Sequence, residues 1–84
     1  MSRRPKLPSQ NLKRTVLLGG RKTSVGLEDA FWQATKEIAR LRNIPIYKLV
    51  AAINAEREHI NLSSAIRLYV LNHYRRLAEA KVER

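Results

Sequence analysis

The chain has 84 residues, a formal net charge of +10, 44% hydrophobic residues and no cysteine. A chain of roughly this length forms one small domain that buries only about 60–65% of its unfolded surface, so a second copy is the expected source of further stability. The absence of cysteine excludes disulfides and thiolate metal sites, and no run approaches the ~18–20 apolar residues that span a bilayer. We therefore expect no metal, no cofactor and no membrane partner.

The positive charge is concentrated at the beginning of the sequence. The first 22 residues contain seven basic residues and no acidic one, and the first acid is Glu28. This distribution favours a polyanion, above all a nucleic acid, as the partner. The alternative is a solubilising basic patch that has no dedicated ligand.

Residues 1–12 carry two prolines and three bases without any apolar period, which predicts a disordered basic arm. Arg3 and Arg4 within this arm are expected to contact DNA phosphates or to enter a minor groove, and a solvated tail is the alternative. Residues 13–80 form the predicted domain, and residues 81–84 are predicted to fray.

Two β-compatible stretches, 13–18 and 21–27, flank Gly19-Gly20, which is a two-residue turn signal. Side chains of the second stretch alternate between an apolar face and a small, polar face that consists of Lys22, Ser24 and Gly26. A lone strand cannot satisfy its backbone groups, so the second stretch must pair with the first, with its copy in a second chain, or with both. Pairing on both edges gives a four-stranded sheet, which is broader than the ribbon that fits a major groove about 12 Å wide.

Three helices are predicted downstream, over residues 28–42, 46–57 and 63–80, because apolar residues recur there at spacings of three and four. The stripe of the first helix ends with Leu41, and Trp32 beside it is predicted to be a core or interface aromatic. Asn61 or Ser63 is expected to cap the third helix.

The segment Asn43-Ile44-Pro45 separates the first two helices, and Pro45 stands near the start of the second, where its missing N–H costs nothing. The free backbone amides that follow would form an anion site, made by Ile46, Tyr47 and Lys48. An ordinary solvated helix end is the alternative.

No enzyme motif occurs in the sequence. A phosphate-binding glycine loop, a dinucleotide fingerprint and a nucleophile with a matching base are all missing, and the seven acids are scattered. We expect no catalytic residue and no small-molecule substrate.

Three segments carry a resemblance to the ribbon-helix-helix (Arc/MetJ-type) DNA-binding family, and most closely to bacterial members with a third helix. They are residues 21–32 (RKTSVGLEDAFW), 49–53 (LVAAI) and 61–67 (NLSSAIR), together with Tyr74. The resemblance implies a mostly α fold with a short β-ribbon. Two chains would pair their strands antiparallel in an intertwined homodimer, and the ribbon would enter the major groove of DNA.

The resemblance also implies roles for individual residues. The base contacts would come from Lys22, Ser24 and Gly26, although Gly26 offers no side chain where family members place a polar residue. Pro45 stands where Ser or Thr is common, so it cannot offer the hydroxyl that would contact a phosphate. The expected phosphate contacts are Arg3, Arg4, Lys13, Arg14, Arg21, Ile46, Tyr47 and Lys48. The expected dimer core consists of Val25, Leu27, Phe31, Trp32, Ile38, Leu49, Val50 and Ile53.

These observations predict a homodimeric, sequence-specific DNA-binding protein, namely a transcriptional repressor in the bacterial cytoplasm, at the nucleoid. Higher-order assembly on DNA is left open. The alternatives are sequence-neutral coating of the nucleoid, a module that binds RNA or an acidic protein, and an antitoxin-like autoregulator. Little sequence remains after the third helix for a toxin-binding segment, which disfavours the last alternative.

Overall fold

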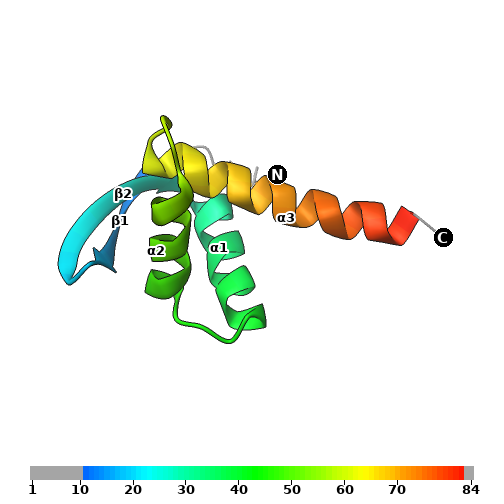
Figure 1. Ribbon diagram of the computed structural model, residues 1–84, viewed down its shortest axis with the longest axis horizontal. Helices are drawn as coiled ribbons and strands as arrows, with labels where there is room; N and C mark the ends of the chain where they lie inside the picture. Colours follow the sequence, from blue (N-terminus) through cyan, green and yellow to red (C-terminus); the bar gives the residue numbers. More distant parts are fainter. Residues whose placement is uncertain (1–10, 83–84) are drawn as a thin grey trace, which may run out of the picture.

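The computed structural model describes residues 11–82, which form a β-hairpin followed by three helices (Figure 1). The elements are β1 (Asn11–Leu18), β2 (Arg21–Glu28), α1 (Asp29–Leu41), α2 (Ile46–Glu56) and α3 (Leu62–Val82). The three predicted helices are confirmed, with their ends within two residues of the expected positions. The predicted arm lies outside the described residues, except that its last two residues, 11 and 12, belong to β1.

Figure 1 shows α1 and α2 side by side, with α3 lying across their upper ends and the hairpin curving away on the left. The core lies where the hairpin meets the three helices. Every element contributes to it, through Val16, Val25, Leu27, Ile38, Ala39, Leu49, Val50, Ile53, Ala65, Ile66 and Val70. Thr35 is also buried, and its hydroxyl donates to the Phe31 carbonyl at 2.6 Å, which satisfies the polar group inside the core.

β1 and β2 pair antiparallel along their whole length, from Asn11 opposite Glu28 to Leu18 opposite Arg21. The two residues that connect them, Gly19 and Gly20, have φ values of +59° and +80°. Positive φ at both positions of a two-residue loop defines a type I′ turn, which glycine adopts without a steric penalty. One edge of β2 is therefore occupied by β1 of the same chain.

The turn also determines which backbone groups of β2 face the other edge. Residues that flank a type I′ turn form a hydrogen-bonded pair, and hydrogen-bonded pairs then alternate with non-hydrogen-bonded pairs along the hairpin. The N–H and C=O groups of Lys22, Ser24 and Gly26 consequently point away from β1. This outer edge of β2 has no neighbouring strand among residues 11–82.

The end of α1 is a Schellman motif. Asn43 adopts φ +59°, its N–H donates to the Arg40 carbonyl at 3.0 Å, and the Ile44 N–H donates to the Ala39 carbonyl at 3.0 Å. These bonds satisfy carbonyls that the helix leaves without partners. The chain can then reverse into Pro45 and α2.

The apolar stripe predicted for α1 is wrong at its last member. Leu41 is 69% exposed, whereas Thr35, Ile38 and Ala39 form the buried face. At 3.6 residues per turn, Leu41 lies more than a quarter turn from the centre of that face. The apolar residues spaced by three and four therefore mark one edge of the buried face of α1, and the centre of that face lies nearer Thr35, Ile38 and Ala39.

The apolar residues of α3 that recur at spacings of three and four pack against the core only in the first half of the helix. Ile66 and Val70 are buried, but Tyr74 and Leu77 are 39% and 49% exposed. Figure 1 shows the reason, because the second half of α3 extends beyond α1 and α2.

A pair of leucines provides a test of this core. Leu49→Ala should lower the free energy of unfolding by about 2–5 kcal/mol, because it opens a cavity at a fully buried position. Leu41→Ala should change it by less than about 0.5 kcal/mol, because that side chain is exposed. Urea unfolding at one fixed protein concentration measures both. Similar losses for the two variants would contradict the observed orientation of α1.

Candidate nucleic-acid interface

One face of the hairpin points away from the core. Directly opposite residues of an antiparallel pair place their side chains on the same face. We call this the outward face, and it consists of Lys13, Thr15 and Leu17 of β1 and, opposite them in the register, Gly26, Ser24 and Lys22 of β2. The buried residues Val16, Val25 and Leu27 lie on the other face, so the predicted alternation of β2 is confirmed.

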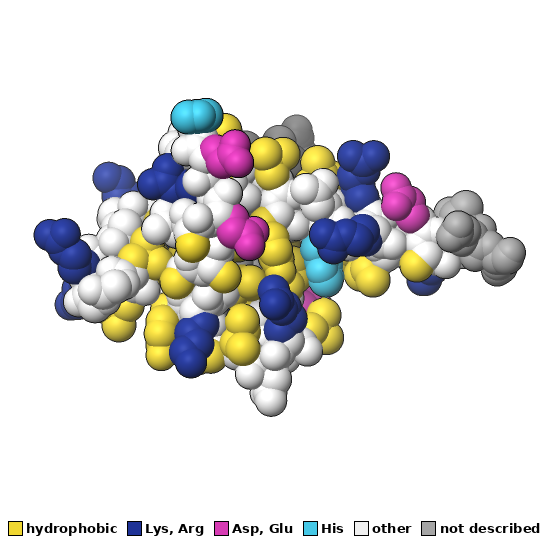
Figure 2. Space-filling view, viewed as in Figure 1, with side chains coloured by type: hydrophobic (Ala, Val, Ile, Leu, Met, Phe, Trp, Pro, Cys, Tyr) yellow, Lys and Arg dark blue, Asp and Glu magenta, His cyan; other side chains and the backbone are white. Residues whose placement is uncertain are grey.

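The three expected base contacts, Lys22, Ser24 and Gly26, therefore share the outward face. Lys22 and Ser24 are exposed, and Gly26 is half-buried. Figure 2 shows Lys and Arg side chains at the hairpin end of the molecule, on the left, with no acidic side chain visible beside them. This part of the surface combines positive charge with small polar side chains.

The start of α3 contacts the outer edge of β2. The Ser63 hydroxyl donates to the Gly26 carbonyl at 2.6 Å. The capping role falls to Asn61, whose Oδ1 accepts the Ser64 N–H at 2.8 Å. Of the two caps that the sequence proposed, Asn61 is thus the correct one, and Ser63 instead joins the helix to the strand.

An ion pair reinforces this junction. Arg67 of α3 donates from Nε to Oε1 of Glu28 at 2.8 Å, and its guanidinium lies 6.0 Å from the centre of the Phe31 ring. The hydrogen bond from Arg67 lowers the pKa of Glu28 below its ordinary value of 4.5. The end of β2, the start of α1 and the start of α3 are therefore joined at one point.

Arg14 is an expected phosphate contact that the structure places against α1. Its side chain is only 16% exposed and pairs with Asp29 at 3.2 Å. Its guanidinium lies 5.6 Å from the centre of the Trp32 ring, a cation–π geometry. Arg14 points inward because it lies opposite Val25, on the buried face of the hairpin. Trp32 packs partly buried against the core, as expected for a core aromatic.

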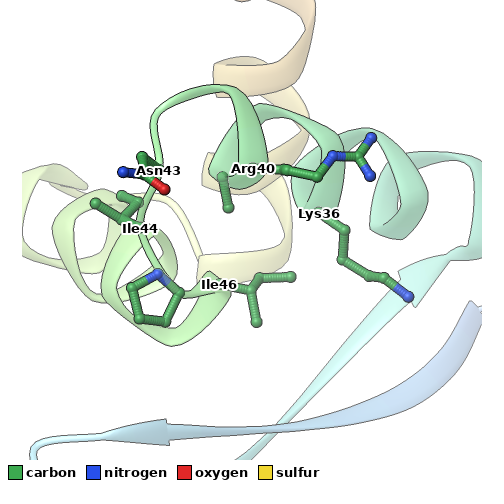
Figure 3. A pocket seen from close by; sticks show the side chains of 7 residues that line it. Lys36, Arg40, Asn43, Ile44 and Ile46 are labelled. Carbon is green, nitrogen blue, oxygen red and sulfur yellow. The ribbon is translucent and has the colours of Figure 1, made fainter.

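The start of α2 borders an open hollow of about 410 Å³ (Figure 3), lined by Lys36, Ala39, Arg40, Asn43, Ile44, Pro45 and Ile46. The Lys48 N–H donates to the Pro45 carbonyl at 3.0 Å, so this amide is not free, contrary to the expectation from the sequence. The amides of Ile46 and Tyr47 precede the first hydrogen bond of the helix.

Two further basic residues, which belong to α1 and were not among the expected contacts, flank this hollow. Lys36 and Arg40 lie four residues apart, on one face of the helix, and both are exposed. Their spacing on a polar face was a signal in the sequence, but their proximity to the start of α2 depends on how the two helices pack.

The remaining expected phosphate contacts are dispersed. Lys13 lies on the outward face, and Arg21 adjoins the type I′ turn, where it is exposed. The side chains of Tyr47 and Lys48 are exposed on the first turn of α2. Arg3 and Arg4 lie outside the described residues.

The residues expected in a dimer core already pack within one chain. Six of the eight are buried, namely Val25, Leu27, Ile38, Leu49, Val50 and Ile53. Phe31 and Trp32 are partly buried against them. Their contact with a second chain stays a prediction.

Within residues 11–82, no group of three His, Cys, Asp or Glu side chains is placed to hold a metal ion. No helix in the described part of the chain is long and apolar enough to cross a membrane.

A β-strand with an outward polar face, followed by two helices that a sharp turn separates, is the architecture of a small class of DNA-binding domains. A family model described as a ribbon-helix-helix domain matches residues 11–74. The chain therefore belongs to the ribbon-helix-helix family, whose members are non-enzymatic DNA-binding regulators of transcription and typically bind DNA as dimers. Neither a curated protein nor a solved structure matches the chain significantly.

The Glu28–Arg67 pair predicts a specific dependence of stability on pH. Because the pKa of Glu28 is lowered in the folded chain, the pair stabilises the fold above pH 4.5, and this contribution is lost as the pH falls through the lowered value. Glu28→Gln should therefore lower the melting temperature at pH 7, and the difference from the wild type should shrink below pH 4.5. Thermal unfolding followed by circular dichroism between pH 3 and pH 7 measures this difference.

The matched control is Glu79→Gln, which removes an exposed carboxylate from α3. This variant should follow the wild type at every pH. A Glu28→Gln difference that stays constant with pH would show that the pair makes no titratable contribution.

Proposed function

We propose that this protein is a homodimeric, sequence-specific DNA-binding regulator that represses transcription at the bacterial nucleoid. The observation that carries the proposal is the position of Lys22 and Ser24. Both lie exposed on the outward face, and their backbone groups line the edge of the same strand that pairs with no other strand among residues 11–82. One strand thus offers a surface for bases and an edge for a second chain.

The outer edge of β2 supports the dimer. Unpaired N–H and C=O groups on an exposed strand edge are a template for another strand, and two identical chains can use the same edge around a twofold axis. A cleft of about 440 Å³ runs beside this edge. It is lined by Leu18, Thr23, Ser24, Val25, Gly26, Asn54, Arg57, Asn61, Leu62 and Ser63. An antiparallel pairing centred near Ser24 would place two copies of the outward face side by side.

The resulting sheet has four strands, because β1 occupies the other edge of each β2. Three strand spacings of about 4.8 Å make the sheet about 14 Å across, which exceeds the width of a major groove, about 12 Å. We therefore propose that the two central β2 strands enter the groove. The two β1 strands would then lie over the phosphate backbones that border the groove. Figure 1 supports this arrangement, since the hairpin bends strongly away from the helices.

Phosphate contacts would fix the register of the dimer on DNA. The amides of Ile46 and Tyr47 lie in the first turn of α2, beside the hollow that Ile46, Lys36 and Arg40 line, and the two basic side chains add positive charge there. The side chain of Lys48 lies exposed on the same helix turn. The net charge of +10 would attract DNA of any sequence, so specificity must come from the outward face.

Proline in place of Ser24 tests the dimer. The Ser24 N–H points to the outer edge, so Ser24→Pro removes a donor from that edge without removing a hydrogen bond to β1. We expect the wild type to sediment as a dimer at micromolar concentration and Ser24→Pro to sediment as a monomer. Circular dichroism reports whether the hairpin and helices persist. A variant that folds and still dimerises would contradict pairing through this edge.

Alanine substitutions test the base contacts. The wild type should prefer its operator over random DNA by at least ~10³, and Lys22→Ala or Ser24→Ala should reduce this preference about tenfold. Arg3→Ala should weaken binding to all sequences alike and make the slope of log K against log salt shallower by about 0.9 for each phosphate that the variant no longer neutralises. Salt titrations by fluorescence anisotropy, on an operator selected from random fragments and on random DNA, measure both effects.

The alternatives predict different outcomes of the same titrations. Equal losses on both DNAs from the Lys22→Ala and Ser24→Ala variants would favour coating of the nucleoid by charge. Tighter binding to RNA than to any selected DNA would favour an RNA-binding module.

A further inference from the structure

Gly26 contributes no side chain to the outward face. The other two positions of β2 on this face carry Lys22 and Ser24, but Gly26 has no side chain that could reach a base. Its backbone does not require glycine either, because the described residues with positive φ are Gly19, Gly20 and Asn43. The backbone conformation therefore does not account for the glycine at position 26.

Lys13 stands directly opposite Gly26 in the hairpin register. By the alternation that the type I′ turn fixes, Lys13 and Gly26 form a non-hydrogen-bonded pair, in which side chains approach each other most closely. Lys13 is exposed and lies on the outward face. Because Gly26 has no Cβ, no side chain at that position competes with the flexible four-carbon stem of Lys13.

Because β1 would lie over the phosphate backbone that borders the groove, only its long polar side chains can reach a base. The Thr15 side chain is too short to extend beyond that backbone, and Leu17 has no polar group that could bind a base. Lys13 combines a long stem with a glycine beside it, so its ammonium can pass over Gly26 toward the base edges. An ammonium in the major groove donates to guanine O6 or N7.

We propose that Lys13, across the strand from Gly26, supplies the third base-reading side chain of each hairpin. This inference rests on the proposed function, since it assumes that the outward face meets the major groove. It gives β1 a part in recognition, and it changes the role of Lys13 from a phosphate contact to a base contact.

Selection of bound fragments from random DNA, with the full chain, tests this role. Lys13→Ala should lose the preference for guanine at one position of each half-site, by about fivefold or more, and should keep the other positions. The double variant Lys13→Ala/Gly26→Lys should recover a preference at that position, because it returns an ammonium to the same place from the other strand. Leu12→Ala, the control on β1, changes an exposed side chain on the opposite face of the hairpin and should select the same sequence as the wild type.

Two results would overturn the inference. If Lys13→Ala keeps every base preference and weakens selected and random DNA equally, with a smaller salt slope, then Lys13 contacts phosphate and the proposed function stands without it. If the wild type selects no consensus at all, the proposed function fails and the inference fails with it. Matching circular dichroism spectra and melting temperatures of the variants confirm that each result reports binding rather than folding.

Discussion

The pairing of β1 with β2 is the constraint on which the rest of the structure depends. The Gly19-Gly20 turn fixes its register, and the register decides two things at once. It places Val16, Val25 and Leu27 in the core and leaves small and basic side chains outside. It also directs the backbone groups of alternate β2 residues to the open edge. A slip of β2 by one residue would exchange its two faces, so that Ser24 or Gly26 would take the place of Val25 and Val25 would face outward.

The junction of β2 with α3 adds a second constraint, at the far end of the same strand. The Ser63 hydroxyl donates to the Gly26 carbonyl, and Arg67 pairs with the Glu28 carboxylate. These two bonds make the start of the third helix an integral part of the domain. Both bonds lie next to the outer edge. They position the start of α3 beside the place where a second strand would pair, and a dimer must accommodate both.

Much of this fold follows from local sequence. The alternation of β2, the glycine turn and the break at Pro45 each depend on backbone preferences of a few adjacent residues, and the structure agrees with them. The expectations that differed depended on tertiary packing. The Arg14 side chain points toward the core because its partners, Asp29 and Trp32, lie on α1. The Lys48 N–H donates a hydrogen bond to the Pro45 carbonyl and is therefore not available to an anion.

The second half of α3 has a different energetic basis from the first. Past Tyr74, whose hydroxyl donates to Glu37 of α1 at 3.5 Å, the helix extends beyond α1 and α2 (Figure 1), so its backbone hydrogen bonds are held mainly by helix propensity, which is marginal for a short segment in water. Amide hydrogen exchange should therefore become faster step by step toward residue 82, while amides near Ile66 open only when the whole domain unfolds. The two ends of one continuous helix would thus differ in lifetime by orders of magnitude.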